Sequence, residues 1–271
     1  MADGWDNAVW LVNEEWAFRF PRLSGVVPGI EREMNLLPRL APRMPLPIPV
    51  PKFFGRPADG YPAPFFGARL IPGVELAETG LPDEGRVPAA RQLGTFLRRL
   101  HEPTLAAEFD AALPRRPERT DIARSLPQEI ERMNAVASAG LWNVPPQATE
   151  LVTRAAALPM LSETVLVHGD LHVRHLLVDE AGDAAGVIDW GDISLAHPSI
   201  DLQIGWSGFS GMARAAFLEA YGPVPNEWTL RARLSALFYS ATLALYAHRD
   251  GLQKLKQEAI AGLRRATDDA G

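Results

Sequence analysis

Two carboxylates, Asp170 and Asp189, lie nineteen positions apart in TVLVHGDLHVRHLLVDEAGDAAGVIDW, residues 164–190. In phosphoryl transfer, one aspartate orients or deprotonates the attacking hydroxyl, and a polar residue about five positions later holds a metal ion. A second aspartate binds the Mg²⁺ ions that bridge the nucleotide phosphates. Asp170, His175 and Asp189 occupy these three places. The spacing therefore suits transfer of a phosphoryl group to a hydroxyl.

Short apolar runs should position these side chains. Strands are expected at 164–167, 175–178 and 185–188, with DEAGD as the turn between the last two. Asp170 then follows a strand, and Asp189 lies at the end of one. The chemistry is expected at strand ends, where loops can bring the groups together.

The N-terminal part reads as strands around one helix. AVWLVNEEWAFRF, residues 8–20, predicts a hairpin, and IEREMNLLPRL, residues 30–40, has helical spacing after Pro28 and Gly29. The proline-dense segment 42–55 is expected to be extended, followed by a second hairpin. Helical patterns dominate beyond Pro72 and Gly73. We therefore expect one lobe over residues 1–72 and a second over residues 73–271.

Composition narrows the class of protein. The chain has 271 residues, 47% of them hydrophobic, no cysteine and no apolar run long enough to cross a bilayer. A net charge of -6 without basic runs argues against a nucleic-acid partner. The N-terminus has no export signal pattern, so a cytoplasmic location is expected. Small molecules are the expected partners, with neither nucleic acid nor membrane involved.

Negative charge is concentrated after residue 72. Residues 1–72 hold 8 Arg or Lys against 7 Asp or Glu, which leaves a net charge of -7 for residues 73–271. An acidic substrate lobe would favour a cationic substrate. A solvated acidic surface explains the same bias, and both readings stay open.

The segments HGDLHVRHLLVD, GVIDW and LGTFLRRLH together resemble the aminoglycoside phosphotransferase family. The resemblance implies an α+β, two-lobed protein-kinase-like fold. Its N-terminal lobe would be a small antiparallel sheet that binds nucleotide, with a hinge near 67–73. Its larger, mainly helical lobe would carry the catalytic loop and the substrate site.

The resemblance also implies roles for single residues. Asp170 would orient or deprotonate the acceptor hydroxyl, and Asp189 would bind Mg²⁺. His168 is expected to pack beneath the catalytic loop. The alternative for both aspartates is a turn-capping or strand-capping role.

Position 175 departs from the family pattern, which has an asparagine there. His175 would then be the second metal ligand, although imidazole suits Mg²⁺ less well than an oxygen donor. The same replacement is a feature of the macrolide-phosphorylating branch. His172 and His175 also permit a zinc site, but the sequence indicates no third ligand.

The lysine that kinase folds use to hold the phosphates is missing. The resemblance places Arg19 at this position and Glu33 at the position of its helix partner. A structural ion pair is the alternative for these two residues. Backbone groups of Arg69 and Ile71, in the hinge, would bind the adenine or guanine base.

GWDNAV, residues 4–9, would be the loop over the phosphates. Only three residues precede Gly4. The start is therefore truncated or misassigned, or the lobe lacks its first strand.

Two functions remain open at this stage. The first is a Mg²⁺-dependent kinase that transfers the terminal phosphoryl group of ATP or GTP to a hydroxyl of an aminoglycoside, a macrolide or a metabolite. The second is a degenerate kinase fold that binds nucleotide or a small molecule without turnover. The short N-terminus, Arg19 and His175 favour the second function, and the presence of both aspartates favours the first.

Overall fold

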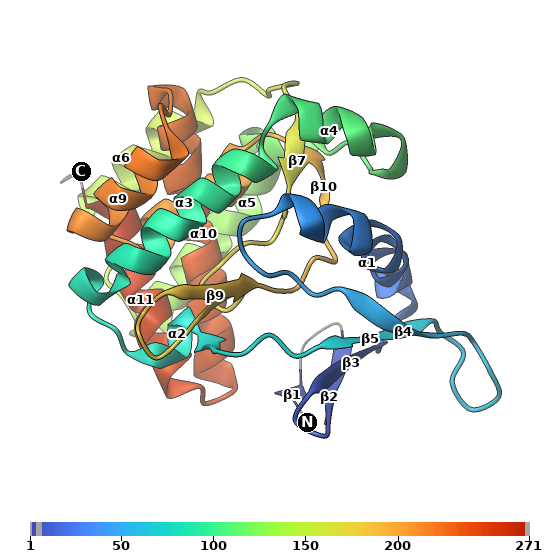
Figure 1. Ribbon diagram of the computed structural model, residues 1–271. Helices are drawn as coiled ribbons and strands as arrows, with labels where there is room; N and C mark the ends of the chain where they lie inside the picture. Colours follow the sequence, from blue (N-terminus) through green and yellow to red (C-terminus); the bar gives the residue numbers. More distant parts are fainter. Residues whose placement is uncertain (1, 4–6, 269–271) are drawn as a thin grey trace.

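The structure is a computed structural model that describes residues 2–3 and 7–268. A five-stranded antiparallel sheet forms the N-terminal region, in the order β1-β2-β3-β5-β4 (Figure 1). Its strands are β1 (Ala2–Asp3), β2 (Asn7–Val12), β3 (Trp16–Pro21), β4 (Pro51–Gly55) and β5 (Phe65–Arg69). Helix α1 (Val27–Leu40) connects β3 to the segment that leads into β4.

The first predicted hairpin is confirmed, with β2 and β3 joined at residues 13–15. Asn13 and Glu14 adopt left-handed backbone conformations, with φ of 53° and 55°. The sheet also has a first strand, because Ala2 pairs with Val9 and Asp3 with Ala8. Of the three alternatives for the short N-terminus, the one in which the lobe lacks its first strand is therefore wrong. Residues 4–6 of the expected phosphate loop lie outside the described part of the chain.

Alternation along the strands decides which side chains face the rest of the molecule. Phe66 and Ala68 of β5 pack with Ile30 and Met34 of α1 in one small buried cluster. Arg19 of β3 pairs in register with Phe66, so its side chain lies on this same face. The opposite face carries aromatic side chains that pack on one another, including Phe18, Phe20, Phe53, Tyr61 and Phe65.

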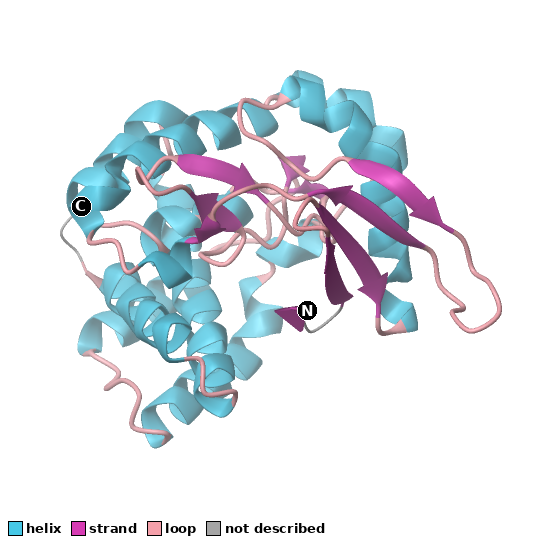
Figure 2. Ribbon diagram, turned by 60° about the horizontal axis from the view of Figure 1, so that its bottom comes forward, coloured by secondary structure: helices cyan, strands magenta, loops and turns pink. Residues whose placement is uncertain are grey.

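The chain beyond the first sheet is mainly helical, and its helices surround short strands (Figure 2). The helices are α2 (Leu76–Thr79), α3 (Val87–Leu100), α4 (Pro103–Phe109), α5 (Ile122–Ser138), α6 (Pro146–Ala156), α7 (Ser199–Leu202), α8 (Ile204–Ser207), α9 (Gly211–Tyr221), α10 (Asn226–Arg249) and α11 (Gln253–Thr267). The strands are β6 (Val74–Glu75), β7 (Val165–Val167), β8 (Leu176–Val178), β9 (Ala184–Val187) and β10 (Ser194–Ala196). The predicted α+β, two-lobed kinase-like fold is confirmed.

The short strands bring two loops together. β7 pairs with β10, and β8 lies between β6 and β9 in a second small sheet. Asp170 follows β7, His175 directly precedes β8, and Asp189 follows β9. Because β8 and β9 form an antiparallel hairpin, the start of β8 lies beside the end of β9. The boundary between residues 72 and 73 stays a prediction; it falls in the connection between β5 and β6.

A large hydrophobic core fills the helical region. Its aromatic members include Trp142, Trp206, Phe238 and Tyr246, which are less than 10% exposed. Helix α10 packs against α5, α6, α7, α8 and α11, so it runs through the centre of this region. The catalytic-loop candidates therefore rest on a well-packed support.

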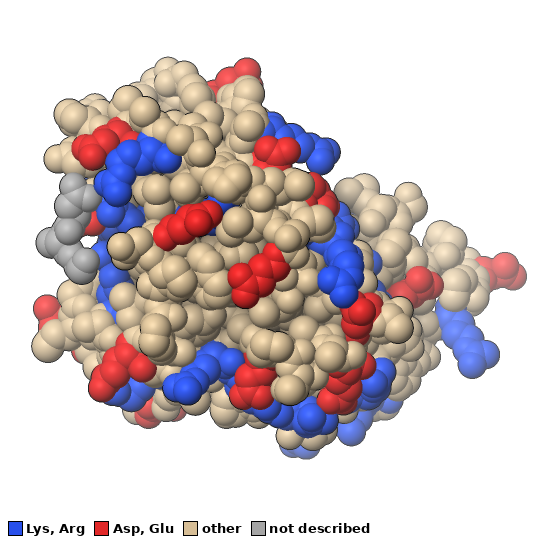
Figure 3. Space-filling model, turned by 90° about the horizontal axis from the view of Figure 1, so that it is seen from above, with Lys and Arg blue, Asp and Glu red and all other residues tan. Residues whose placement is uncertain are grey.

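On the face seen in Figure 3, acidic and basic side chains are interspersed and form no single acidic patch. Within residues 2–3 and 7–268, no helix has both the length and the apolarity needed to cross a membrane.

Packing of α3 on α9 depends on Gly94. A Cβ at this position would overlap the carbonyl oxygen of Phe217 and lie 3.0 Å from Ala220 Cβ. We expect Gly94→Ala to lower the free energy of unfolding by about 1–3 kcal/mol, the usual cost of overpacking. Urea unfolding followed by circular dichroism measures this change. Gly25→Ala is the control, because nothing lies within 4 Å of its Cβ position; equal stability of the two variants would contradict the packing account.

Candidate active site

Asp201 fixes the start of the loop that follows β7. Its carboxylate accepts backbone hydrogen bonds from His168 at 2.7 Å and Gly169 at 2.9 Å. His101 Nε2 lies 3.3 Å from the same carboxylate, which is fully buried. Burial alone would raise the pKa of Asp201, but hydrogen bonds from His101 and the backbone outweigh it and lower that pKa. The charged form of Asp201 thus holds the loop in place.

The imidazole of His168 connects this loop to the one after β9. Its Nε2 lies 2.9 Å from the carbonyl oxygen of Ile188 and donates to it, because a carbonyl can only accept. Its Nδ1 then accepts the N–H of Asp170 at 3.2 Å. Burial lowers the pKa of His168, so the ring is neutral. These contacts give His168 the supporting role expected from the sequence.

Asp170 presents a carboxylate whose side chain is 35% exposed. Burial, followed by the charges of Asp192 and Asp189, raises the pKa of Asp170 to about 8. Arg119 and a hydrogen bond from Tyr239 oppose this rise. A raised pKa makes the Asp170 carboxylate a stronger base. Nearby positive charge would favour its ionised form.

Arg119 and Tyr239 stabilise the catalytic loop through hydrogen bonds. Tyr239, on α10, donates to the carbonyl oxygen of Gly169 at 3.3 Å and accepts from Arg119 Nη2 at 3.1 Å. Gly169 has a φ of +89°, and a Cβ there would overlap the carbonyl oxygen of Asp192. Only glycine allows the two loops to approach this closely.

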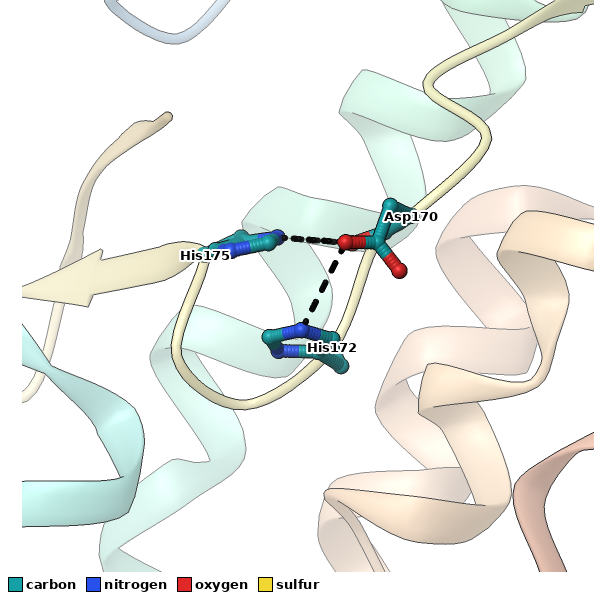
Figure 4. Close-up of side chains that lie close together, drawn as sticks. All are labelled: Asp170, His172 and His175. Carbon is teal, nitrogen blue, oxygen red and sulfur yellow. Dashed lines mark hydrogen bonds and ion pairs between the residues drawn. The ribbon is translucent and has the colours of Figure 1, made fainter. Parts of the chain in front are cut away.

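His172 and His175 lie beside Asp170, with their rings stacked at 3.9 Å between centroids (Figure 4). His175 Nδ1 lies 2.7 Å from the carbonyl oxygen of Asp170, so it carries a proton and donates. His172 Nδ1 accepts the N–H of Arg174 at 3.3 Å. His172 Nε2 therefore carries the proton, and it lies 3.7 Å from Asp170 Oδ2.

These tautomers decide which nitrogen can bind a cation. Asp170, His172 and His175 lie close enough to form a metal-binding cluster, which supplies the third residue that the zinc hypothesis lacked. However, the nitrogens that His172 and His175 direct at Asp170 both carry protons. The remaining nitrogen, His175 Nε2, has a free lone pair and lies 3.6 Å from Asp189 Oδ2. Burial lowers the pKa of His175 to about 4, which keeps this ring neutral.

Asp189 uses its two oxygens for two different neighbours. Oδ1 accepts from Arg19 Nη2 at 2.6 Å, and Oδ2 faces His175. Burial alone would raise the pKa of Asp189, but the Arg19 charge outweighs it and holds the pKa well below its usual value. The residue has a φ of 65°, a left-handed conformation that directs this carboxylate back towards the first lobe.

Arg19 also binds Glu33 of α1, with Nη1 at 2.6 Å from Oε1. The same oxygen accepts the backbone N–H of Trp190 at 3.0 Å. Trp190 is fully buried, and its ring packs against His168 and Phe96. Glu33 thus connects the first lobe, through Arg19 and Trp190, to the core of the second.

The two hinge residues are separate from this group of contacts. The Arg69 side chain is 74% exposed and pairs with Glu15 at 3.3 Å. Ile71 packs against β9, where a Cβ on Gly186 would lie 2.8 Å from it. The backbone role expected for Arg69 and Ile71 stays a prediction.

The structure therefore brings Asp170, His175, Asp189, Arg19 and Glu33 into one chain of contacts. Sequence reasoning missed Arg119, Tyr239, Asp192 and the backbone of Trp190. Arg119 and Tyr239 lie far from the motif in the chain, and no local pattern indicates them. Trp190 and Asp192 lie within three positions of Asp189 in the sequence, and this closeness was the signal that could have indicated them.

The sequence pattern of the phosphotransferase enzyme family matches residues 1–237. The chain belongs to this family. Viomycin phosphotransferase of Streptomyces vinaceus is 27% identical over 207 residues, which cover 74% of this phosphotransferase and 70% of that protein. The uncharacterised Bacillus subtilis protein YcbJ is 38% identical over 56 residues, only 21% of this chain and 18% of that protein.

Solved structures agree over nearly the whole phosphotransferase. The GDP and kanamycin complex of APH(2")-IIia has a TM-score of 0.68 and 25% identity, covering 98% of this chain and 91% of that one. The macrolide 2'-phosphotransferase MphH from Brachybacterium faecium shares the fold, with a TM-score of 0.60, 23% identity and coverage of 96% and 89%. The predicted activity class, small-molecule O-phosphotransferase, is confirmed.

Removing Arg19 should destabilise the connection between the lobes. Its side chain is 11% exposed and that of Glu33 is fully buried, so Arg19→Met leaves a buried carboxylate without its partner. We expect a loss of about 3–5 kcal/mol in the free energy of unfolding, measured in urea. Adding Glu33→Gln should restore part of it. Arg69→Met, whose ion pair is exposed, is the control with a loss below about 1 kcal/mol.

Asp201→Ala should loosen the catalytic loop, because it removes the acceptor of two buried N–H groups. Each unsatisfied donor costs about 1–3 kcal/mol. Hydrogen exchange should show faster exchange at His168 and Gly169, with overall stability reduced. Asp250→Ala, at an exposed helix end, serves as the comparison. Unchanged protection in Asp201→Ala would rule out the anchoring role.

Proposed function

We propose that this phosphotransferase moves the terminal phosphoryl group of ATP or GTP to a hydroxyl of a cationic small molecule. The observation that carries the proposal is the chain of contacts from Asp170 through His175 and Asp189 to Arg19 and Glu33. It joins a base candidate, a metal-binding pair and a phosphate-binding cation. Phosphoryl transfer requires these three components at one place.

Asp170 is the residue that orients and deprotonates the acceptor hydroxyl. Burial and neighbouring carboxylates raise its pKa to about 8, and a cationic acceptor would favour the charged form again. The ionised carboxylate then accepts the hydroxyl proton as the oxygen attacks phosphorus.

Asp189 and His175 would hold the divalent cation. A carboxylate oxygen and an unprotonated imidazole nitrogen face each other at 3.6 Å, which fits two ligands of one ion. The bound ion, Mg²⁺ in the expected reaction, supplies positive charge to the transferring phosphate oxygens. The carboxylate fits Mg²⁺ well and the imidazole fits it poorly.

Arg19 would hold nucleotide phosphates, with Glu33 fixing its orientation. An arginine supplies charge and paired N–H donors to phosphate oxygens. Backbone groups of Arg69 and Ile71 would bind the base, as expected for the hinge. The GDP present in the APH(2")-IIia complex supports a nucleotide as co-substrate. A reaction that consumes nucleoside triphosphates suits the cytoplasm.

Two observations support a cationic acceptor. Asp192 adds negative charge beside Asp170, so positively charged groups on a substrate would stabilise the site. The relatives also include a viomycin phosphotransferase, and kanamycin is present in a neighbouring structure.

Asp170→Asn keeps the shape of the side chain and removes its basicity. We expect transfer to fall by about 10²- to 10⁴-fold, with nucleotide affinity within about twofold of the wild type. Transfer of labelled phosphate and calorimetry with ADP measure the two quantities. Asp250→Asn is the control, since this carboxylate is remote from the site. Undiminished turnover in Asp170→Asn would rule out Asp170 as the group that deprotonates the acceptor hydroxyl.

The acceptor proposal is tested with purified protein, labelled ATP or GTP and a set of hydroxylated compounds. Viomycin, kanamycin, an erythromycin-type macrolide and neutral sugars sample the charge classes. Transfer to the cationic members, weakened by high salt, is the expected result. Transfer to the neutral sugars alone would contradict a cationic acceptor. Nucleotide binding without any transfer would instead support a protein that binds without turnover.

A further inference from the structure

The hydrogen bonds of the two stacked histidines determine which nitrogen of His175 can bind a metal ion. His175 Nδ1 is committed as a donor to the Asp170 carbonyl oxygen at 2.7 Å. His175 Nε2 therefore keeps its lone pair and faces Asp189. His172 stacks on the same ring at 3.9 Å with 29° between the planes, which restricts rotation of His175. Metal sites use this kind of support to orient a ligating imidazole.

Asp189 can receive a cation on this side without losing Arg19. The guanidinium occupies Oδ1 at 2.6 Å, whereas Oδ2 faces the histidine. First-row divalent ions bind imidazole nitrogen and carboxylate oxygen at about 2.0–2.2 Å, so two ligands of one ion lie on the order of 3–4 Å apart. The separation of 3.6 Å between His175 Nε2 and Asp189 Oδ2 falls in this range.

The kinds of ligand atom at this site, one imidazole nitrogen and one carboxylate oxygen, determine which cations it favours. Mg²⁺ demands oxygen ligands and dehydrates reluctantly, so an imidazole nitrogen is a poor exchange for water. Imidazole suits transition metals, while triphosphate oxygens suit hard cations such as Mg²⁺ and Mn²⁺. Mn²⁺ accepts both kinds of donor. We propose that the His175–Asp189 pair makes this metal site prefer Mn²⁺ over Mg²⁺, with the metal held by one nitrogen and one carboxylate oxygen of the protein.

This inference rests on the proposed role of the pair in phosphoryl transfer, but it can be measured without turnover. The probe is Mn²⁺ alone and Mn²⁺ with ADP, added to the full-length protein. The fall of the free-ion electron paramagnetic resonance signal gives the affinity, and competition with Mg²⁺ gives the selectivity. Pulsed measurements on bound Mn²⁺ detect a directly bonded ¹⁴N nucleus.

The wild type should show ¹⁴N coupling and prefer Mn²⁺ over Mg²⁺ by at least about tenfold more than His175→Asn does. His175→Asn should lose the nitrogen coupling while it still binds Mg²⁺ through oxygen. His172→Phe is the matched control, because it keeps a ring to stack on His175 and removes the nitrogen atoms of His172, which should not be ligands. This variant should keep the coupling.

Three results would overturn the inference: no Mn²⁺ bound at millimolar concentration, Mn²⁺ bound without nitrogen coupling, or coupling that survives in His175→Asn. The wild-type spectrum decides the matter even where a variant fails to fold. Phosphate transfer measured in parallel with Mg²⁺ and Mn²⁺ separates the two proposals. Transfer with no metal preference refutes the selectivity alone, whereas nitrogen-bound Mn²⁺ without transfer to any acceptor refutes the proposed function alone.

Discussion

The carboxylate of Asp189 is shared between two lobes and two kinds of partner. One oxygen binds Arg19 from the first sheet at 2.6 Å, and the other faces His175 from the second lobe at 3.6 Å. Glu33 shares Arg19 and also accepts the N–H of Trp190. The Arg19–Glu33 pair is buried; such a pair adds little net stability over apolar packing, but breaking it is costly. This group of charges therefore joins the sheet and α1 to the catalytic loop, beside the apolar packing of Leu36, Leu37 and Leu40 against the second lobe.

The second lobe supports the site through buried polar groups attached to a rigid core. Asp201 holds the loop at His168 and Gly169, while Tyr239 reaches it from α10. Because these partners belong to packed helices, the loop cannot shift without breaking hydrogen bonds that have no solvent to replace them. Such a support keeps Asp170 in place for an incoming hydroxyl.

Much of this arrangement could be predicted from the sequence, since strand ends and motif spacing are local properties. The hairpin of β2 and β3 and the helix after Pro28 follow from apolar periodicity and turn residues. The pairing of β1 with β2 could not be predicted, because two residues carry too little pattern. Tyr239, on α10, reaches the catalytic loop at Gly169 and contacts Arg119, which precedes α5; no local signal encodes this packing. The tautomers of His172 and His175 likewise depend on backbone groups that only the folded loop brings near.

The central claim is that Asp189 Oδ2 and His175 Nε2 bind one metal ion while Arg19 stays on Asp189 Oδ1. Crystals grown with Mn²⁺ and ADP, measured at a wavelength where manganese scatters anomalously, test it most directly. The account predicts an anomalous peak within bonding distance of both His175 Nε2 and Asp189 Oδ2. A peak among Asp170, His172 and His175, or one bound to phosphate oxygens without His175, would contradict it.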